Sequence, residues 1–271
     1  KFMDIGSAKP TKEELEMVPH HLVDEVDPRN HWTAAEYQAL AKSYINDVFS
    51  RGKLPIVSGG TGLYVNSLLY DMDFSVVPKQ NDLRIQLEKE ALVYGNQWVH
   101  NRLKKLDPAT AQRIHPNNLK RVIRAIEVWE TSGDIIPDFS QSFVKTKDYQ
   151  WILIGLTRER ELLYQRINKR VDRLLEAGLV EEVEKLLDMG LTETNCGMQG
   201  IGYKEVIGFL EGKYDKIEAI RLIKRNTRHY AKRQMTWFRR YPEIKWFNLS
   251  EDTKQEEAVH SILSYLNVKL K

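Results

Sequence analysis

The residues best suited to chemistry lie in one glycine-rich turn, Gly59-Gly60-Thr61-Gly62. A short apolar run, Leu54 to Val57, precedes the turn, and an apolar-rich segment from Leu63 to Leu69 follows it. This order predicts a buried strand, a tight turn and a helix. Glycines let a backbone approach a ligand closely, and the N–H groups at a helix start attract anions, beside which Thr61 adds a hydroxyl. Two readings stay open: an anion site, or a purely structural connection between strand and helix.

A second stretch suited to ligand binding is strongly basic. Residues 221 to 240 contain eight Lys or Arg and no Asp or Glu, although the net charge of the chain is only +3. At 3.6 residues per turn, five cations of a helix from about 217 to 240 share one arc: Arg221, Arg225, Arg228, Lys232 and Arg239. Three apolar residues recur on the opposite side: Ile223, Tyr230 and Trp237. We therefore expect one face to pack on the core and the other to meet a polyanion, with an ordinary solvated face as the alternative.

Composition narrows the class of protein. The chain has 271 residues with 42% hydrophobic content, enough for one large domain or two small ones, and no apolar run is as long as a membrane span. The one cysteine, Cys196, excludes an intrachain disulfide and fits a reducing compartment, so we expect a cytoplasmic protein. The adjacent His20 and His21 have no third ligand at a metal spacing, so no zinc site is expected.

Strand and helix patterns alternate at the two ends of the chain, which predicts an α/β fold with a parallel sheet. The expected strands are 54–57, 151–156 and 246–249, and the expected helices are 34–49, 63–69, 159–177, 180–189, 217–240 and 256–270. Between Asp71 and Asp148 the strand patterns vanish and helical spacing dominates, with helices expected over 107–113 and 119–131 and a loop over 134–148. We therefore expect a core of residues 1–71 and 149–271 and a helical insertion of residues 72–148.

Eight motifs follow one another along nearly the whole chain. They are Met3-Asp-Ile-Gly-Ser-Ala-Lys-Pro10, His20-His-Leu-Val-Asp24, Arg51-Gly-Lys-Leu-Pro55, Gly59-Gly-Thr-Gly-Leu-Tyr64, Ile114-His-Pro-Asn-Asn118, Arg121-Val-Ile-Arg-Ala-Ile-Glu127, Ile201-Gly-Tyr-Lys-Glu205 and Asn226-Thr-Arg-His-Tyr-Ala-Lys-Arg-Gln-Met-Thr-Trp-Phe-Arg239. In this order they resemble the bacterial tRNA isopentenyltransferase (tRNA dimethylallyltransferase) family. The last motif is the most specific.

The resemblance implies both a function and a fold. The family transfers a dimethylallyl group from dimethylallyl diphosphate to N6 of adenine 37 in tRNA, giving N6-(dimethylallyl)adenosine. The adenine is flipped into a channel through a P-loop NTPase-like core, a parallel sheet flanked by helices. A helical insertion domain grips the tRNA anticodon stem-loop, and Mg²⁺ assists the diphosphate. We expect these two substrates as partners, no membrane partner, and a monomer.

One feature of the family pattern is missing. The family's P-loop, and the Asp-Ser-x-Gln segment with its proposed general base, lie upstream of the position that Lys1 occupies here. We therefore expect that an N-terminal piece is absent from this sequence, and no general base is assigned.

The resemblance also implies how the diphosphate is held. The diphosphate-binding set is Gly59, Gly60, Thr61, Arg166 and Arg170, and the catalytic pair is Thr61 and Arg170. The exocyclic amine of adenine is a poor nucleophile, so the reaction needs a rigid pose and neutralisation of the leaving diphosphate. Arg166, Arg170 and Arg173 lie on one side of one helix. We favour Arg170, then Arg166, as the opposing cation; the alternative is that all three are ordinary surface arginines.

The expected tRNA contacts fall into three groups. The first is Arg84, Lys120, Arg121 and Arg124; the second is Gln199, Gly200, Ile201, Gly202, Tyr203 and Lys204; the third is Lys232, Arg233, Gln234, Trp237, Phe238 and Arg239. The second group offers two glycines, an aromatic ring and a cation, which suit the close approach of a splayed nucleotide. Trp237 has a second reading as a core residue, because it shares a helix face with Ile223 and Tyr230.

Two other classes of function stay open. A nucleotide kinase or adenylate prenyltransferase acting on free nucleotide would share the core but would not need the insertion or the basic helix. A non-catalytic RNA-binding protein would have no use for the glycine turn with Thr61. Comparing the binding of tRNA and of free AMP separates the three.

Overall fold

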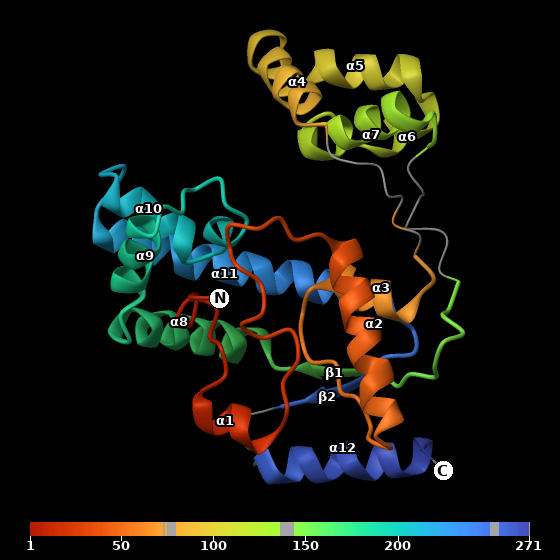
Figure 1. The fold of residues 1–271 in the computed structure, drawn as a ribbon. Helices are drawn as coiled ribbons and strands as arrows, with labels where there is room; N and C mark the ends of the chain where they lie inside the picture. Colours follow the sequence, from red (N-terminus) through yellow and green to blue (C-terminus); the bar gives the residue numbers. More distant parts are fainter. Residues whose placement is uncertain (73, 75–79, 136–143, 250–254, 271) are drawn as a thin grey trace. The chain divides into compact units, whose positions relative to one another are not determined.

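The computed structural model describes residues 1–72, 74, 80–135, 144–249 and 255–270, and the chain divides into two compact units. The first unit is Lys1–Leu69 with Thr146–Lys271, and the second is Tyr70–Lys145. Helices dominate both units (Figure 1). None of the described helices is long and apolar enough to cross a membrane.

The first unit combines helices with a small parallel sheet. Its elements are α1 (Lys12–Met17), α2 (Ala34–Ser50), α3 (Gly62–Leu69), β1 (Ile154–Thr157), α8 (Arg160–Glu176), α9 (Leu179–Asp188), the short 3₁₀ helix η1 (Gly197–Gln199), α10 (Tyr203–Leu210), α11 (Lys216–Phe238), β2 (Lys245–Asn248) and α12 (Gln255–Lys269). The helices expected over 34–49, 63–69, 159–177, 180–189, 217–240 and 256–270 are confirmed with shifts of one or two residues at their ends.

Local sequence signals explain where α2 begins and ends. The hydroxyl of Thr33 accepts a hydrogen bond from the Glu36 amide at 3.2 Å, and the Glu36 carboxylate accepts one from the Thr33 amide at 2.7 Å. This reciprocal cap satisfies two of the N–H groups that a helix start leaves unpaired. Gly52 follows the last turn with a φ of 65°, a conformation in which glycine has no steric cost.

The main core of the first unit lies among α8, α9, α10 and α11. Ten residues with almost no exposed surface make it: Val171, Leu179, Val183, Leu186, Leu191, Met198, Tyr203, Val206, Ile207 and Ile223. A smaller cluster of Ala41, Ile45 and Leu68 joins α2 to α3. The long helix α11 packs against α8, α10 and α3, so it connects the main core to the part of the unit that contains α3 (Figure 1).

The expected parallel sheet is confirmed for one pair of strands. β1 and β2 run parallel, with Ile154 opposite Lys245 and Thr157 opposite Asn248. β1 begins three residues later than the pattern of 151–156 predicted. Gly155 lies under the ring of Trp246, where a Cβ would come within 2.5 Å of a ring carbon. The bulky side chain of β2 therefore requires a glycine on β1.

The buried strand predicted over Leu54 to Val57 is wrong. These residues are not part of a strand, and Ile56 is 84% exposed. A strand needs a neighbour to pair its N–H and C=O groups, and among the described residues β1 and β2 pair only with each other. Without such a neighbour, this apolar run forms no strand and stays largely exposed.

The second unit is entirely helical apart from one isolated bridge between Tyr70 and Lys145, so far as it is described. It consists of α4 (Asn81–Tyr94), α5 (Asn96–Leu106), α6 (Pro108–Arg113) and α7 (Leu119–Ser132). Nine buried residues form its core: Leu87, Ala91, Val99, Leu103, Ala111, Val122, Ile123, Ala125 and Ile126. The helices expected over 107–113 and 119–131 are confirmed, and part of the loop expected over 134–148 lies outside the described residues.

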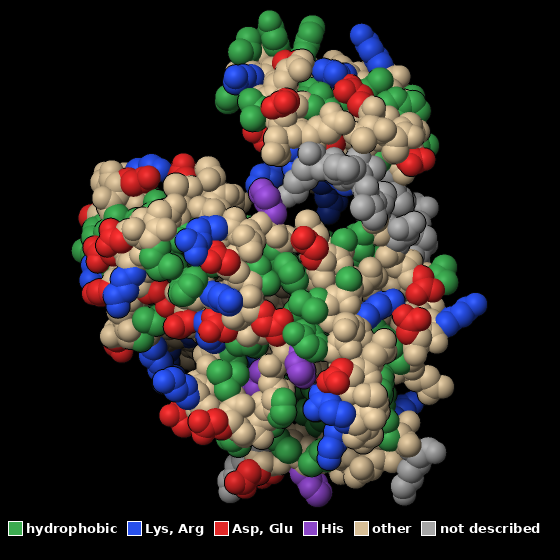
Figure 2. Space-filling view, viewed as in Figure 1, with side chains coloured by type: hydrophobic (Ala, Val, Ile, Leu, Met, Phe, Trp, Pro, Cys, Tyr) green, Lys and Arg blue, Asp and Glu red, His purple; other side chains and the backbone are tan. Residues whose placement is uncertain are grey.

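Large apolar side chains also lie on the surface of the second unit, over α4 and α5 (Figure 2). Tyr94 and Trp98 are both exposed and pack ring against ring, with their centroids 5.1 Å apart. Gly95 lies between the two helices with a φ of 85°. The turn between α4 and α5 is therefore built on a glycine and flanked by aromatic rings.

Candidate active site and nucleic-acid surface

Gly60, in the turn before α3, and Gly62, the first residue of α3, are both explained by the helix that packs against them. A Cβ on Gly60 would lie 2.1 Å from Nε2 of Gln234, and a Cβ on Gly62 would lie 2.2 Å from the Trp237 ring. The Gln234 side chain also donates a hydrogen bond to the Gly60 carbonyl at 2.9 Å. The turn is therefore fixed directly to α11, and Gln234 and Trp237, both expected to contact tRNA, support it.

Gly59 and Thr61 differ from these two glycines because they face open space. A Cβ on Gly59 would meet no heavy atom within 4 Å, and the Thr61 side chain is exposed. Thr61 directly precedes α3, and its carbonyl accepts the hydrogen bond of the Val65 amide at 3.1 Å. Thr61 therefore occupies the position just before the first turn of α3, where unpaired N–H groups suit an anion.

Three of the four arginines of α8 lie on one side of the helix, and all three are exposed. Arg166, Arg170 and Arg173 make no ion pair with another described residue, while the buried Ile167 and Val171 anchor the helix on the other side. This leaves the three guanidinium groups available to an anionic ligand. No hydrogen bond within the described structure joins Thr61 to Arg166 or Arg170.

α11 nevertheless connects the two elements. Arg228 of α11 donates to the Asn168 side chain of α8 at 2.7 Å, and Gln234 of the same helix holds Gly60. Gln234 lies six positions after Arg228 on this helix, which is ~9 Å along the axis. The arginine-bearing helix and the glycine turn are thus fixed to neighbouring turns of one rigid element.

Two cations of the charged face expected on α11 are bound to protein groups, so this face is less open to a polyanion than its spacing predicted. Arg221 forms an ion pair with Glu218 at 2.5 Å, and Arg228 is bonded to Asn168. Lys232 and Arg239 remain exposed without an ion pair to a described residue. A helix of the core can use its cations to bind neighbouring elements, so spacing alone did not distinguish these roles.

The apolar face expected on α11 also ends early. Ile223 is buried in the main core, but Tyr230, seven residues later, is 38% exposed and lies under the guanidinium of Arg233 at 5.7 Å from its ring centroid. Trp237 is half-buried and donates to the Tyr241 hydroxyl at 3.3 Å. The core does not follow α11 as far as its periodicity suggested.

The segment Gln199 to Lys204 divides into an exposed and a buried part. The side chains of Gln199 and Lys204 are exposed, whereas Tyr203 is only 3% exposed and its hydroxyl donates to Glu182 at 2.7 Å. Burial raises the pKa of Tyr203 above its usual value, and the hydrogen bond to Glu182 raises it further. The Tyr203 ring belongs to the core, so the surface of this segment is formed by its neighbours.

In the second unit, two of the expected RNA contacts are bound to protein. Arg84 and Arg124 both reach the carboxylate of Glu127, at 2.6–2.7 Å and 2.6 Å, and the Gln80 amide donates to it at 2.7 Å. Burial of Glu127 would raise the pKa of its carboxyl, but the hydrogen bonds from Arg84, Arg124 and Gln80 lower that pKa to about 2. These contacts fix the start of α4 to α7.

Lys120 and Arg121 have a different environment. Both are exposed in the first turn of α7 and make no ion pair with a described residue. Asn118 precedes the helix without capping it through its side chain. These two cations are therefore the ones in this group that are open to a phosphate backbone.

Two buried carboxylates, Glu127 and Glu182, were missed by the sequence analysis. Glu127 is fully buried, and Glu182 lies on the same face of α9 as the core residues Leu179 and Leu186. The sequence did contain a signal for such residues, namely a carboxylate on an otherwise apolar helix face. A charged side chain at such a position is buried and must be paired inside the protein.

Comparison with known proteins places the chain in a family. Residues 1–241 match the family model described as IPP transferase. A tRNA dimethylallyltransferase from Alkaliphilus oremlandii is 52% identical over 263 residues, which cover 97% of this chain and 84% of that protein. The corresponding protein of Clostridioides difficile is 49% identical over 271 residues, which cover 100% of this chain and 87% of that protein.

Two solved structures are also similar. The full-length tRNA isopentenylpyrophosphate transferase from Bacillus halodurans matches with a TM-score of 0.72 and 41% identity, over 100% of this chain and 84% of that chain. A eukaryotic dimethylallyltransferase acting on tRNA matches with a TM-score of 0.80 and 27% identity, over 98% and 70% of the two chains. The chain therefore belongs to the IPP transferase family.

Proposed function

We propose that this protein is a tRNA prenyltransferase that transfers a dimethylallyl group from dimethylallyl diphosphate to N6 of adenine 37. The observation that carries the proposal is the agreement, over nearly the whole chain, with relatives named tRNA dimethylallyltransferase. The exposed Thr61 beside the start of α3 and the exposed arginines of α8 supply the kind of groups that a diphosphate requires.

In this reaction a bond forms between N6 of the adenine and the first carbon of the dimethylallyl group. The bond from that carbon to the diphosphate oxygen breaks, and one proton leaves the amine. Negative charge grows on the departing diphosphate, so donors aimed at its oxygens lower the barrier. We assign this role to the Thr61 hydroxyl, the Gly59 and Gly60 backbone, and Arg170 with Arg166. No described residue is assigned as the base that takes the proton.

For tRNA we propose contacts from both units. Lys120 and Arg121 would meet the phosphate backbone from the helical unit, and Gln199, Lys204, Lys232 and Arg239 would do so from the core. Because the amine of a base in a stacked loop is inaccessible, we propose that the adenine is flipped into a channel of the P-loop NTPase-like core. The helical unit would grip the anticodon stem-loop.

We also propose that Mg²⁺ binds the diphosphate during the reaction. The described residues contain no group of three or more His, Cys, Asp or Glu side chains placed to hold a metal ion. Mg²⁺ bound to phosphates usually needs only one or two protein carboxylates. We therefore assign no protein ligand to it. We further propose that the protein acts as a monomer in the cytoplasm.

The test is a transfer assay with isotopically labelled dimethylallyl diphosphate, Mg²⁺ and two acceptors, tRNA and free AMP. We expect label in tRNA, recovered after digestion as a nucleoside heavier than adenosine by one C5H8 unit. A tRNA in which adenine 37 is replaced by guanine should accept none. Label in AMP but not in tRNA would instead support the adenylate prenyltransferase, and tRNA binding without any transfer would support the non-catalytic RNA-binding protein.

A further inference from the structure

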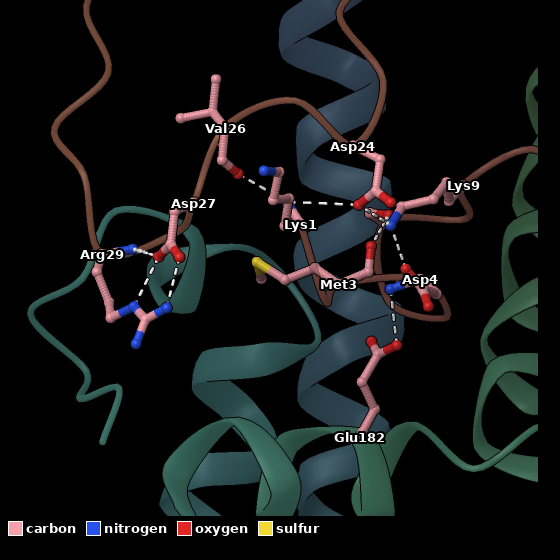
Figure 3. Close-up of polar contacts among 10 residues, drawn as sticks. Lys1, Met3, Asp4, Lys9, Asp24, Val26, Asp27, Arg29 and Glu182 are labelled. Atoms are coloured by element: carbon pink, nitrogen blue, oxygen red, sulfur yellow. Dashed lines mark hydrogen bonds and ion pairs between the residues drawn. The ribbon is translucent and has the colours of Figure 1, made fainter. Parts of the chain in front are cut away.

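One buried carboxylate, that of Glu182 on α9, joins two segments that are far apart in the sequence. It accepts hydrogen bonds from the backbone amides of Asp4 and Ile5 at 2.7 Å and of Gly6 at 3.0 Å. It also accepts one from the Tyr203 hydroxyl at 2.7 Å. Figure 3 shows the Glu182 side chain pointing from its helix to the backbone at Asp4. A single side chain therefore binds the N-terminal segment to the start of α10.

Packing between the same two segments is close enough to require glycine. A Cβ on Gly6 would lie 2.5 Å from the Tyr203 ring, and a Cβ on Gly197 would lie 2.6 Å from the Met3 sulfur. The segment Met3 to Gly6 thus lies directly on the stretch that leads from Gly197 to Tyr203. That stretch includes Gln199, and Lys204 follows it, so the N-terminal segment packs on the backbone that carries both exposed side chains.

The backbone of the N-terminal segment is strained. Among the described residues, the non-glycine residues with positive φ are Phe2, Ala8, Leu22 and Asp24, with φ between 50° and 67°. Such conformations cost free energy and persist only where surrounding contacts hold them. Lys9 joins the two strained stretches, because its ammonium group binds the carboxylates of both Asp4 and Asp24 (Figure 3). Backbone strain that is kept in place by surrounding contacts is typical of a segment whose shape is used.

We propose that Glu182 is a positioning residue for tRNA binding. Its carboxylate fixes the segment Gln199 to Lys204 against the segment Met3 to Gly6, so that Gln199 and Lys204 have their bound conformation before the RNA arrives. Pre-organised contacts bind more tightly, because less freedom is lost on association. The inference rests on the proposed function, since it assumes that this segment meets tRNA.

The charge of Glu182 makes it possible to test this proposal by the direction in which tRNA affinity changes. Replacing Glu182 by Gln removes a negative charge, which by itself should strengthen the binding of a polyanion. Loss of pre-organisation should weaken that binding. The two effects have opposite signs, so the direction of the change shows which dominates. Glu184 lies two residues further along α9, is exposed, and makes no ion pair with a described residue, so Glu184→Gln is the matched control for charge.

The experiment compares wild type, Glu182→Gln and Glu184→Gln well below their melting temperatures. We expect Glu182→Gln to raise the Kd and KM for tRNA about tenfold, with the KM for dimethylallyl diphosphate and the kcat at saturating tRNA nearly unchanged. Glu184→Gln should leave the tRNA affinity equal or slightly tighter. A role in stability alone would lower the melting temperature and the active fraction without separating the two KM values.

If Glu182→Gln does not fold, Tyr203→Phe tests instead whether the contacts of Glu182 position the tRNA-binding segment. It keeps the ring that packs on Gly6 and removes one of the four hydrogen bonds to Glu182, so we expect a weaker tRNA-specific loss in the same direction. Unchanged tRNA affinity in the folded variants would overturn the inference, while the wild type would still prenylate tRNA. A wild type that transfers no dimethylallyl group to tRNA would instead overturn the proposed function.

Discussion

Arg84 of α4 and Glu127 of α7 form a two-pronged ion pair across 43 residues of sequence, with Nε 2.7 Å from Oε1 and Nη2 2.6 Å from Oε2. Glu127 has no exposed surface, and Arg124 adds a third charged contact. A tRNA phosphate that drew Arg84 away would leave a buried carboxylate short of partners, which is costly. Arg84 therefore has a structural role that is independent of RNA.

The first prediction concerns the stability of the helical unit. Glu127→Gln should lower the free energy of unfolding by about 2–4 kcal/mol, because it breaks a buried pair and leaves two arginines facing a neutral amide. Glu130→Gln, on the same helix, removes a half-exposed pair with Arg102 and should cost less than about 1 kcal/mol. Urea unfolding followed by circular dichroism checks both. Equal losses would show that burial of Glu127 does not matter.

The second prediction is the pH dependence that follows from the same carboxylate. The pKa of Glu127 falls from 4.5 to about 2 in the folded protein, so its contribution is complete above pH 4.5. Below that value the unfolded state binds the proton first, and the contribution is lost as pH falls toward about 2. The stability difference between wild type and Glu127→Gln should therefore narrow steadily over this window. Urea midpoints measured from pH 6 downward test it, and a constant difference would contradict the lowered pKa.

Sequence patterns predicted the local elements well because their causes are local. The Thr33 cap, the Pro108 helix start and the Gly133 helix end each depend on residues within one turn. Leu54 to Val57 was predicted wrongly because a strand depends on a neighbouring strand, which the apolar run itself does not specify. The pairs of Glu127 with Arg84 and of Glu182 with Asp4 join residues 43 and 178 positions apart, and no periodicity brings such partners together.

In the candidate site, too, local features could be predicted from the sequence and contacts with distant residues could not. The glycine turn and the α8 arginines were found from residue type and spacing, and the structure leaves Thr61 and Arg170 exposed. Whether a given glycine serves the fold or a ligand could be decided only from the residue that packs against it. Gly60 and Gly62 leave room for Gln234 and Trp237, whereas a Cβ on Gly59 would meet no neighbouring atom. Composition cannot distinguish a glycine needed by the fold from one kept open for a ligand.

The third prediction separates these glycines. Gly62→Ala should destabilise the protein by about 1–3 kcal/mol, because its methyl group collides with the rigid Trp237 ring. Gly59→Ala should change stability by less than about 0.5 kcal/mol, since its methyl group points into open space. If the diphosphate approaches this backbone, Gly59→Ala should still raise the KM for dimethylallyl diphosphate. Thermal unfolding together with steady-state kinetics checks both statements; a Gly59→Ala enzyme with normal kinetics would remove Gly59 from the diphosphate site.

The fourth prediction concerns the hydroxyl of Thr61. Thr61→Ala should raise the barrier to prenyl transfer by about 2–4 kcal/mol, because one fixed donor to the developing charge is lost. Binding of tRNA should be unaffected. Thr61→Ser keeps the hydroxyl and should retain most of the rate. Transfer rates and tRNA affinities of the three proteins decide it, and a parallel loss of both properties in Thr61→Ala would make Thr61 a folding or RNA residue instead.

The last prediction distinguishes cations of α11 that meet RNA from those that hold the fold. Lys232 is exposed and has no ion pair within the described residues, whereas Arg221 is bonded to Glu218. If Lys232 neutralises a phosphate, Lys232→Ala should weaken binding to every tRNA similarly and reduce the slope of log affinity against log salt by about one unit. Arg221→Ala removes the same charge from the same helix and should leave the slope unchanged. Titration of tRNA at several salt concentrations compares the two. Parallel lines for Lys232→Ala and wild type would remove this end of α11 from the RNA surface and leave Lys120, Arg121, Gln199 and Lys204 as the expected phosphate contacts.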